Sequence, residues 1–280
     1  MRPFIYLLLT VLLGAPAVAS AQEPVPPEKA PAAAAEPEKD AAQAWEHSLE
    51  ANFGTAYVWR GLNLLGQGNQ HYSPGVFMPG FSTTKGIWTL GWVGAFQLSG
   101  KNLASNVDGA AGLEHDVYVQ VEKPLVGDLS WSASLTAYGF PASKEEASGA
   151  DRSLYVEPSV GVSWGKLINP FFKIHWFHGV QSALADFDYV YLNVGGSRDV
   201  ELTSKATLKL AGEGGMKVFT GDDTVEDNVW DVQLGAVVEY AATDELTLKG
   251  GALFAWSNFA GKKLADEATA WLVAGVCLSW

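Results

Sequence analysis

Apolar and polar side chains alternate with a period of two residues along most of the chain from His47 onward. In the clearest stretch, Trp230 and Val232 share one face, while Asp231 and Gln233 share the other. Successive side chains of a β-strand point to opposite faces, so this period predicts strands and not helices. The strands predicted from this alternation span 47–62, 73–82, 86–98, 113–124, 128–140, 152–165, 169–179, 187–198, 202–219, 228–241, 245–258 and 268–280.

One apolar face per strand is expected both in a soluble β-sandwich and in a membrane barrel. The lengths of the connections between strands must therefore distinguish the two folds. Short turns are predicted at 83–85, 125–127, 166–168, 199–201 and 242–244. Longer loops are predicted at 63–72, 99–112, 141–151, 180–186, 220–227 and 259–267. Strict short-long alternation with an even strand count is typical of outer-membrane proteins. The sequence therefore predicts an all-β fold, a transmembrane antiparallel up-and-down β-barrel of about 12 strands with the long loops outside the cell.

Aromatic residues gather near the predicted strand ends, where a membrane barrel carries two girdles at the headgroup level. Trp271 is an exception, since it falls on the inward face of the predicted register. The predicted interface residues are Tyr57, Trp59, Trp176, Trp230 and Trp256 on the external side, and Trp88, Trp131, Trp164, Tyr240 and Trp280 on the periplasmic side.

Both ends of the sequence agree with export to the outer membrane. Residues 1–21 combine a positive start, an apolar run and an Ala-Ser-Ala site, which predicts a cleaved signal peptide. Residues 22–46 are rich in Pro, Ala and Glu and predict a disordered periplasmic lead-in before the barrel at 47–280. The last strand closes on Trp280, the terminal aromatic that we expect the barrel-assembly machinery to read.

Composition narrows the expected partners. The chain has 30 glycines, 11 tryptophans, one cysteine and a net charge of -13. Its acidity argues against nucleic acid and against docking on anionic lipid through a basic patch. The lone Cys277 excludes a disulfide within the chain. The expected partners are outer-membrane lipid, lipopolysaccharide, the barrel-assembly machinery and a small solute, with divalent cations bridging the acidic loop 221–227 to lipopolysaccharide.

Charged residues on the second face of the strands must point into the lumen, because Lys or Arg facing lipid at the midplane costs about 2–4 kcal/mol. Both signs occur, so no ion selectivity follows. For Arg60 we predict a structural pair with Asp116 or another lumen carboxylate, and the alternative is a constriction charge that grips a solute. The lumen candidates are Glu50, Arg60, Asp116, Glu122, Glu157, Lys173, His175, Lys205, Lys209, Glu213, Asp231, Glu239 and Lys249.

The sequence gives little support for a metal centre or an enzyme. His175 and His178 are three residues apart on one strand, so they point to opposite faces and cannot share a metal ion without a bulge. No G-x-S-x-G motif is present, although Ser, His and Asp from separate strands can still form a triad. We therefore predict no cofactor, no metal and no catalytic residue.

The first predicted strand carries the residues Tyr57, Trp59, Arg60 and Gly61. A Tyr-x-aromatic-Arg-Gly run at this place resembles the TorF-type porin family, bacterial outer-membrane proteins of unsettled function. The strands containing 114–118 and 189–191 look like two further strands of that family. The resemblance implies a barrel that passes small solutes, and it supplies no catalytic residues. The segment after Gly61 departs from the family pattern, because it lacks the usual Ser-Gln run.

The function predicted from these observations is a porin-like passive channel for small solutes. Two alternatives remain: a structural or surface-binding barrel that does not conduct, and a barrel enzyme of the lipase or protease type.

Overall fold

A computed structural model describes residues 44–60, 62–63, 75–98, 114–140, 153–165, 168–181, 188–220, 229–258 and 268–280. The predicted signal peptide, nearly all of the predicted lead-in and most of the predicted long loops lie outside these residues, so those predictions stay predictions.

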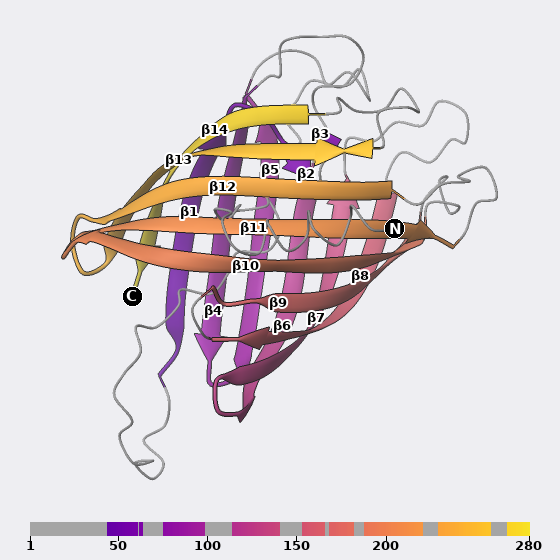
Figure 1. The fold of residues 1–280 in the computed structure, drawn as a ribbon, viewed down its shortest axis with the longest axis horizontal. Helices are drawn as coiled ribbons and strands as arrows, with labels where there is room; N and C mark the ends of the chain where they lie inside the picture. The colour runs from indigo at the N-terminus through magenta and orange to yellow at the C-terminus, as the bar shows by residue number, and fades with distance from the viewer. Residues whose placement is uncertain are drawn as a thin grey trace, which may run out of the picture.

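Twelve antiparallel strands close into a single barrel, in which each strand pairs with its neighbours along the chain (Figure 1). This confirms the predicted fold class and strand number. The barrel strands are β1 (Glu46–Gly54), β4 (Val76–Lys85), β5 (Trp88–Gln97), β6 (Glu114–Val126), β7 (Leu129–Phe140), β8 (Ser153–Trp164), β9 (Phe171–Gln181), β10 (Tyr189–Thr203), β11 (Ala206–Phe219), β12 (Val229–Ala241), β13 (Leu246–Ser257) and β14 (Ala268–Ser279).

The barrel closes where the first strand meets the last. β1 pairs with β14 from Ser48 opposite Ser279 to Gly54 opposite Val273. His47 and Trp280 extend this seam, because the amide of each donates to the carbonyl of the other at 2.9 and 3.1 Å. Trp280 therefore belongs to the closing hydrogen bonds of the wall.

Four of the described connections are short, because two to four residues join β4 to β5, β6 to β7, β10 to β11 and β12 to β13. One predicted turn is wrong. Residues 199–201 lie inside β10, which continues to Thr203, so the turn falls at Ser204 and Lys205. Asp199 and Glu201 are exposed because β10 extends into water at this end. Polar residues of this kind are also typical of a turn, so the sequence did not distinguish the two.

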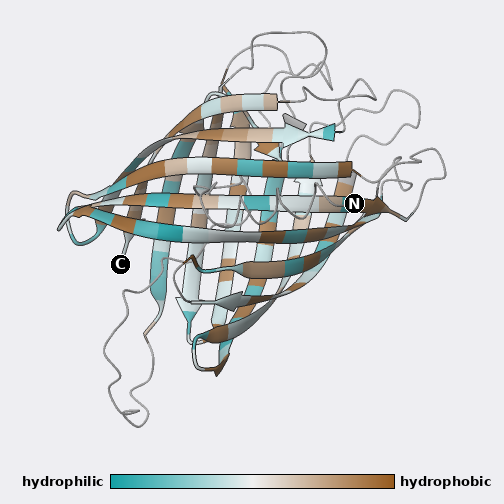
Figure 2. Ribbon diagram, viewed as in Figure 1, coloured by the Kyte–Doolittle hydropathy of each residue, from teal (hydrophilic) through white to brown (hydrophobic). Residues whose placement is uncertain are grey.

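The wall has an apolar outer surface and a polar or aromatic inner one. Neighbours in sequence differ sharply: Val117 is 58% exposed and Tyr118 only 4%. Along strands such as β12, short hydrophobic and hydrophilic bands alternate (Figure 2). An apolar shell of this extent would be unfavourable in water and suits lipid. Among the described residues, no helix is long and apolar enough to cross a membrane.

Two inward-facing glycines make room for tyrosine rings inside the barrel. A Cβ atom on Gly91 would lie 2.2 Å from Cζ of Tyr118, and one on Gly215 would lie 2.1 Å from the hydroxyl of Tyr191. Each ring therefore lies flat over a backbone position where any side chain would collide with it, which holds Tyr118 and Tyr191 against the inner wall.

Candidate functional site

The first predicted strand, 47–62, does not stay in the wall. β1 ends at Gly54, and residues 55–60 and 62–63 form a separate hairpin inside the barrel, made of β2 (Val58–Trp59) and β3 (Leu62–Asn63). We call residues 55–60 and 62–63 the lumen hairpin. Thr55 still bonds to the edge of β14, because its amide donates to the Leu272 carbonyl at 2.9 Å. The chain leaves the wall directly after that contact.

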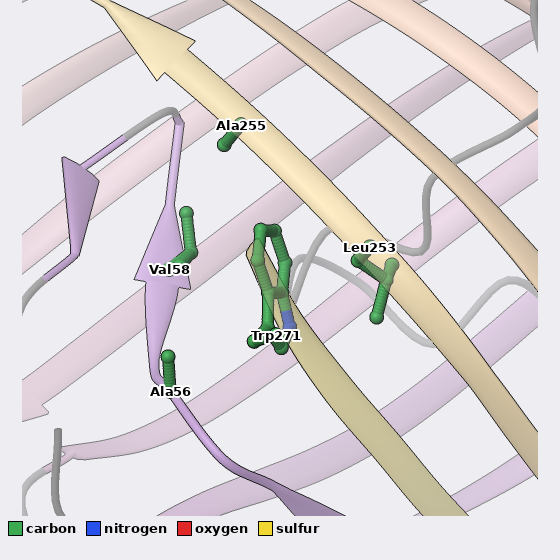
Figure 3. Close-up of a cluster of buried hydrophobic side chains, with 5 residues drawn as sticks. All are labelled: Ala56, Val58, Leu253, Ala255 and Trp271. Atoms are coloured by element: carbon green, nitrogen blue, oxygen red, sulfur yellow. The ribbon is translucent and has the colours of Figure 1, made fainter. Parts of the chain in front are cut away.

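One side of the lumen hairpin packs on apolar residues of the inner wall. Ala56 and Val58 are buried against Leu253, Ala255 and Trp271, which belong to β13 and β14. The Trp271 ring lies between the hairpin and β13 (Figure 3). The sequence predicts that Trp271 faces inward, and in the structure the lumen hairpin packs against this inward-facing side chain.

Tyr57 anchors the start of the hairpin on the opposite wall. Its buried hydroxyl donates a hydrogen bond to the carboxyl group of Glu114 on β6. Burial raises the pKa of the Tyr57 phenol, and the charges of Glu114 and Asp116 raise it further. The phenol is therefore held in its protonated, donating form.

Arg60 forms the central contact, in the turn between β2 and β3. Its Nη2 donates to both carboxylate oxygens of Glu157 on β8, at 2.7 and 2.6 Å, and its Nη1 donates to the Tyr189 hydroxyl at 2.9 Å. Only 2% of Arg60 and 1% of Glu157 are exposed. A buried charge requires such a partner, because an unpaired one is strongly unfavourable. The pair is the structural kind that the sequence predicts, with Glu157 and not Asp116 as the carboxylate.

Aromatic rings complete the surroundings of the Arg60 guanidinium. Its central carbon lies 4.4 Å from the ring centroid of Tyr191 and 5.6 Å from that of Tyr189. Glu157 Oε1, which accepts from Arg60, also lies 2.9 Å from His175 Nδ1 and 3.3 Å from the Tyr138 hydroxyl. The carboxylate is therefore shared by three hydrogen-bonding side chains and is fixed in position.

Lys217 holds the backbone of the hairpin turn. Its Nζ donates to the carbonyl oxygen of Arg60 at 2.7 Å and lies 3.8 Å from the carboxylate of Asp231. Tyr191 also donates to that carboxylate, at 3.0 Å. Arg60 has φ 47°, a left-handed conformation that non-glycine residues rarely adopt. Lys217 is thus one of the contacts that keep the turn in a strained shape.

The positions of Tyr57 and Trp59 correct their prediction as membrane-interface residues. Both lie inside the barrel: Tyr57 is buried, and the Trp59 ring packs on Tyr138, Phe177 and Tyr189. The alternation on which the prediction rested continues past Gly54, where the chain has already left the wall. The exposed or half-exposed outward aromatics are Trp88, Trp131, Trp164, Trp176, Trp230, Tyr240, Trp256 and Trp280.

The lumen near the short turns is more open than the hairpin level. Lys249 lies 3.2 Å from Glu50 and 3.9 Å from Glu239, and Lys209 lies 3.1 Å from Glu239. These four side chains are between 19% and 37% exposed. They form a row of alternating charge that water reaches, whereas the contacts of Arg60 are dry.

Two of the predicted lumen residues lie elsewhere. Lys205 is in the exposed turn between β10 and β11, and Glu122 is exposed near the short-turn end of β6. Both strands extend beyond the lumen, so side chains near their ends meet water whichever face they occupy. The remaining candidates lie at inward positions of the wall, or reach the lumen from the hairpin in the case of Arg60: Glu50, Asp116, Glu157, Lys173, His175, Lys209, Glu213, Asp231, Glu239 and Lys249.

Several residues that hold the hairpin were not predicted from the sequence, among them Glu114, Tyr189, Tyr191 and Lys217. Lys217 continues the inward positions of β11, so the alternation could have identified it. The contacts of Tyr189 and Tyr191 with Arg60 have no signal in the sequence. In the parts of the chain that the structure describes, no group of three or more His, Cys, Asp or Glu residues could hold a metal ion.

Comparisons with known proteins identify the fold. No family model matches the chain. No curated protein matches it either. Among solved structures, the KdgM porin aligns over 83% of this chain and 99% of its own, with 8% identity and a TM-score of 0.50.

Two other solved structures score slightly lower. The NanC porin aligns over 82% of this chain and 98% of its own, with 12% identity and a TM-score of 0.47. LpxR from Salmonella typhimurium aligns over 82% and 99%, with 9% identity and the same TM-score of 0.47. Identities this low concern the fold alone, and the resemblance to TorF-type porins stays a prediction. The chain has the twelve-stranded barrel fold of an outer-membrane porin.

Proposed function

We propose that this protein is a porin-like channel of the outer membrane that passes small solutes and is narrowed by the lumen hairpin. The row of accessible charges formed by Glu50, Lys209, Glu239 and Lys249 carries this proposal. A barrel of about eight strands is filled by its own side chains, whereas a larger one leaves room inside. Accessible lysines and carboxylates inside a lipid-facing wall indicate that water fills this part of the lumen.

The outer surface supports the location and the expected partners. Apolar residues face outward around the barrel, and exposed aromatics such as Trp176 and Trp164 lie toward its two ends. Lipid and lipopolysaccharide are the partners for this surface, and the barrel-assembly machinery is the partner for the strand ending at Trp280. In this arrangement the short turns and the N-terminal segment are periplasmic, and the long loops are external.

A barrel that does not conduct is the second candidate, and the lumen hairpin favours it. Tyr57, Arg60 and the turn held by Lys217 fix the hairpin to three different strands, and their side chains are nearly dry. The two candidates differ in whether solutes pass the hairpin. A barrel enzyme is the third candidate, but the carboxylate of Glu157, which would orient His175, is already bound by Arg60.

Current recordings in planar bilayers, with cysteines placed on the two faces of β13, test the proposal. Lys249→Cys in a Cys277→Ser background places a thiol in the row of accessible charges, and a charged methanethiosulfonate reagent should change the unitary conductance. Leu248→Cys is the matched control, because Leu248 is the preceding residue and faces outward. A wild-type barrel that inserts but carries no current would favour the non-conducting barrel. Hydrolysis of lipid or peptide substrates by the purified barrel would favour the enzyme.

A further inference from the structure

We propose that Glu157, Tyr189 and Tyr191 form a binding site for the guanidinium group of a small cationic solute, and that Arg60 fills this site from within. The inference rests on the proposed channel function and names its solute class. Arg60 is then a tethered occupant, which a guanidinium-bearing solute replaces when the hairpin turn moves aside.

The geometry of the site suits a planar cation with donors on several edges. Glu157 accepts from one terminal nitrogen of the guanidinium, and the Tyr189 hydroxyl accepts from the other. The Tyr191 ring lies 4.4 Å from the central carbon, within the range of a cation–π interaction. A guanidinium group reaches both acceptors while lying over the ring, whereas a compact ammonium group cannot do so from one position.

The three residues of the site lie on strands of the barrel wall, whereas Arg60 lies on the lumen hairpin. Glu157 lies on β8, and Tyr189 and Tyr191 lie on β10. Within the described residues, the strand pairing of β1 with β4 and β14 stops at Gly54, and Thr55 makes the next hydrogen bond to β14. The turn can therefore withdraw while every paired strand of the barrel remains in place.

The turn also stores strain that withdrawal would release. Arg60 is held at φ 47°, a conformation that is unfavourable for a non-glycine residue and persists only where the surroundings enforce it. The surroundings here include the guanidinium contacts and the hydrogen bond from Lys217 to the Arg60 carbonyl. A solute that takes over the guanidinium contacts would remove part of what enforces this conformation.

The charged residues that remain at this level when Arg60 withdraws would attract a cation. Besides Arg60, the cations on the inner wall at this level are Lys173 and Lys217, among the residues that the structure describes. The inward carboxylates there are Glu114, Asp116, Glu157, Glu213 and Asp231. These five acidic side chains outnumber the two lysines at this level. A wall of one sign concentrates ions of the other sign, so the open lumen favours cations.

Chemical complementation of Arg60→Ala tests the site. This variant removes the tethered guanidinium, and methylguanidinium at millimolar concentration supplies a free one. We expect methylguanidinium to raise the melting temperature of Arg60→Ala by about 2–5 °C in a saturable manner, as a ligand specific for the folded state does. Urea, a neutral molecule of the same shape, and methylammonium, a cation of a different shape, should have no such effect at equal concentration.

Two matched variants show whether the effect belongs to this site. Glu157→Gln combined with Arg60→Ala should abolish the rise in melting temperature. Arg198→Ala, which removes an exposed arginine of β10, should not respond to methylguanidinium. If Arg60→Ala refolds poorly, the recovery of folded barrel with methylguanidinium, relative to urea, becomes the readout, and Arg60→Gln provides a milder second variant. If methylguanidinium has no more effect than urea on either Arg60→Ala or Arg60→Gln, the proposal is overturned.

Current recordings separate this inference from the proposed channel. Methylguanidinium added to a conducting Arg60→Ala barrel should lower its current at least several-fold, and urea should not. An Arg60→Ala barrel that conducts but is neither blocked nor stabilised by methylguanidinium would overturn the guanidinium site and leave the proposed channel intact. A variant that is stabilised by methylguanidinium but carries no current would keep the site and overturn the channel.

Discussion

Arg60 and Glu157, 97 residues apart in the sequence, bind each other inside the barrel through two hydrogen bonds of 2.7 and 2.6 Å. This contact joins the lumen hairpin to the wall. Tyr57 and Lys217 add hydrogen bonds on two further strands, so the hairpin is attached on several sides. Both the stability of the barrel and the passage through it therefore depend on the same few polar contacts.

Separating Arg60 from Glu157 should destabilise the barrel. Arg60→Ala leaves a buried carboxylate without its cation, and we expect a loss of about 3–5 kcal/mol in the free energy of unfolding, less where water enters. Glu157→Gln should show a similar loss, and the double variant should lose less than the sum of the two. Denaturant-induced unfolding in detergent micelles, followed by heat-modifiable migration, measures these values. Arg198→Ala is the control, and losses that simply add would show that the two residues do not act together.

The glycine beneath Tyr118 should not tolerate a side chain. Gly91→Ala places a methyl group 2.2 Å from Cζ of Tyr118, so we expect a loss of about 1–3 kcal/mol from overpacking. Gly250→Ala is the matched control, because a Cβ atom there meets nothing within 4 Å. Adding Tyr118→Ala to Gly91→Ala should relieve the collision. Equal stability of the two glycine variants would contradict the close packing of this ring.

The strands were predictable from the sequence because the wall has lipid on its outer side and the lumen on its inner side. Successive side chains of a strand therefore face different surroundings. That contrast repeats at every second residue, so β12 was predicted at 228–241 and lies at Val229–Ala241. The lumen hairpin was not predictable in this way. Ala56 and Val58 pack on one wall while Tyr57 and Arg60 reach others, so these four side chains are all buried and the alternation gives no sign that the chain has left the wall.

The partner of Arg60 was also beyond the sequence pattern. The alternation places Asp116 and Glu157 on the same inner surface, but it does not give the height of one strand relative to another around the barrel. The pairing depends on the register of β6, β7 and β8 together with the path of the hairpin. The type of contact was therefore predictable from the cost of a buried charge, while the identity of the carboxylate was not.

Removing Trp280 should impair assembly of the barrel. The residue exchanges two backbone hydrogen bonds with His47, and its ring lies 5.5 Å from the His47 ring. The deletion loses both the seam contacts and the aromatic end of the last strand, so the membrane yield and the heat-modifiable fraction should fall. Trp164→Ala, at another exposed aromatic toward the same end, is the control. An unchanged yield in the deletion would count against an assembly role of this residue.

Surface labelling should show which end of the barrel faces outside. Cysteines at Asp108, Ser148 and Asp223, which lie outside the described residues, are expected to react with an impermeant reagent on intact cells. A cysteine at Asp244, in the short turn between β12 and β13, should react only after lysis. The tests require Cys277→Ser, because the native thiol faces the lumen beside Ser48. Labelling of Asp244→Cys alone on intact cells would reverse the proposed orientation.

Stability should depend on the Tyr57 proton at alkaline pH. The pKa of this phenol is raised above the ordinary 10.0 by burial and by the carboxylates of Glu114 and Asp116. The folded barrel thus keeps a proton that the unfolded chain loses, so the contribution of Tyr57 is present below pH 10 and declines as the pH rises above it. The difference in unfolding free energy between the wild type and Tyr57→Phe should be constant from about pH 7 to 9 and should then shrink by up to about 1.4 kcal/mol per pH unit.

Two comparisons make this measurement specific to the hairpin. Tyr240→Phe changes an exposed tyrosine of β12 and controls for the removal of one hydroxyl. Glu114→Gln removes the main charged neighbour of Tyr57 while keeping an oxygen that can accept its hydrogen bond, so the decline should still begin near pH 10 but end at a lower pH, with a smaller total loss. A wild-type barrel whose advantage over Tyr57→Phe stays constant up to pH 12 would show that the Tyr57 proton does not hold the hairpin in place.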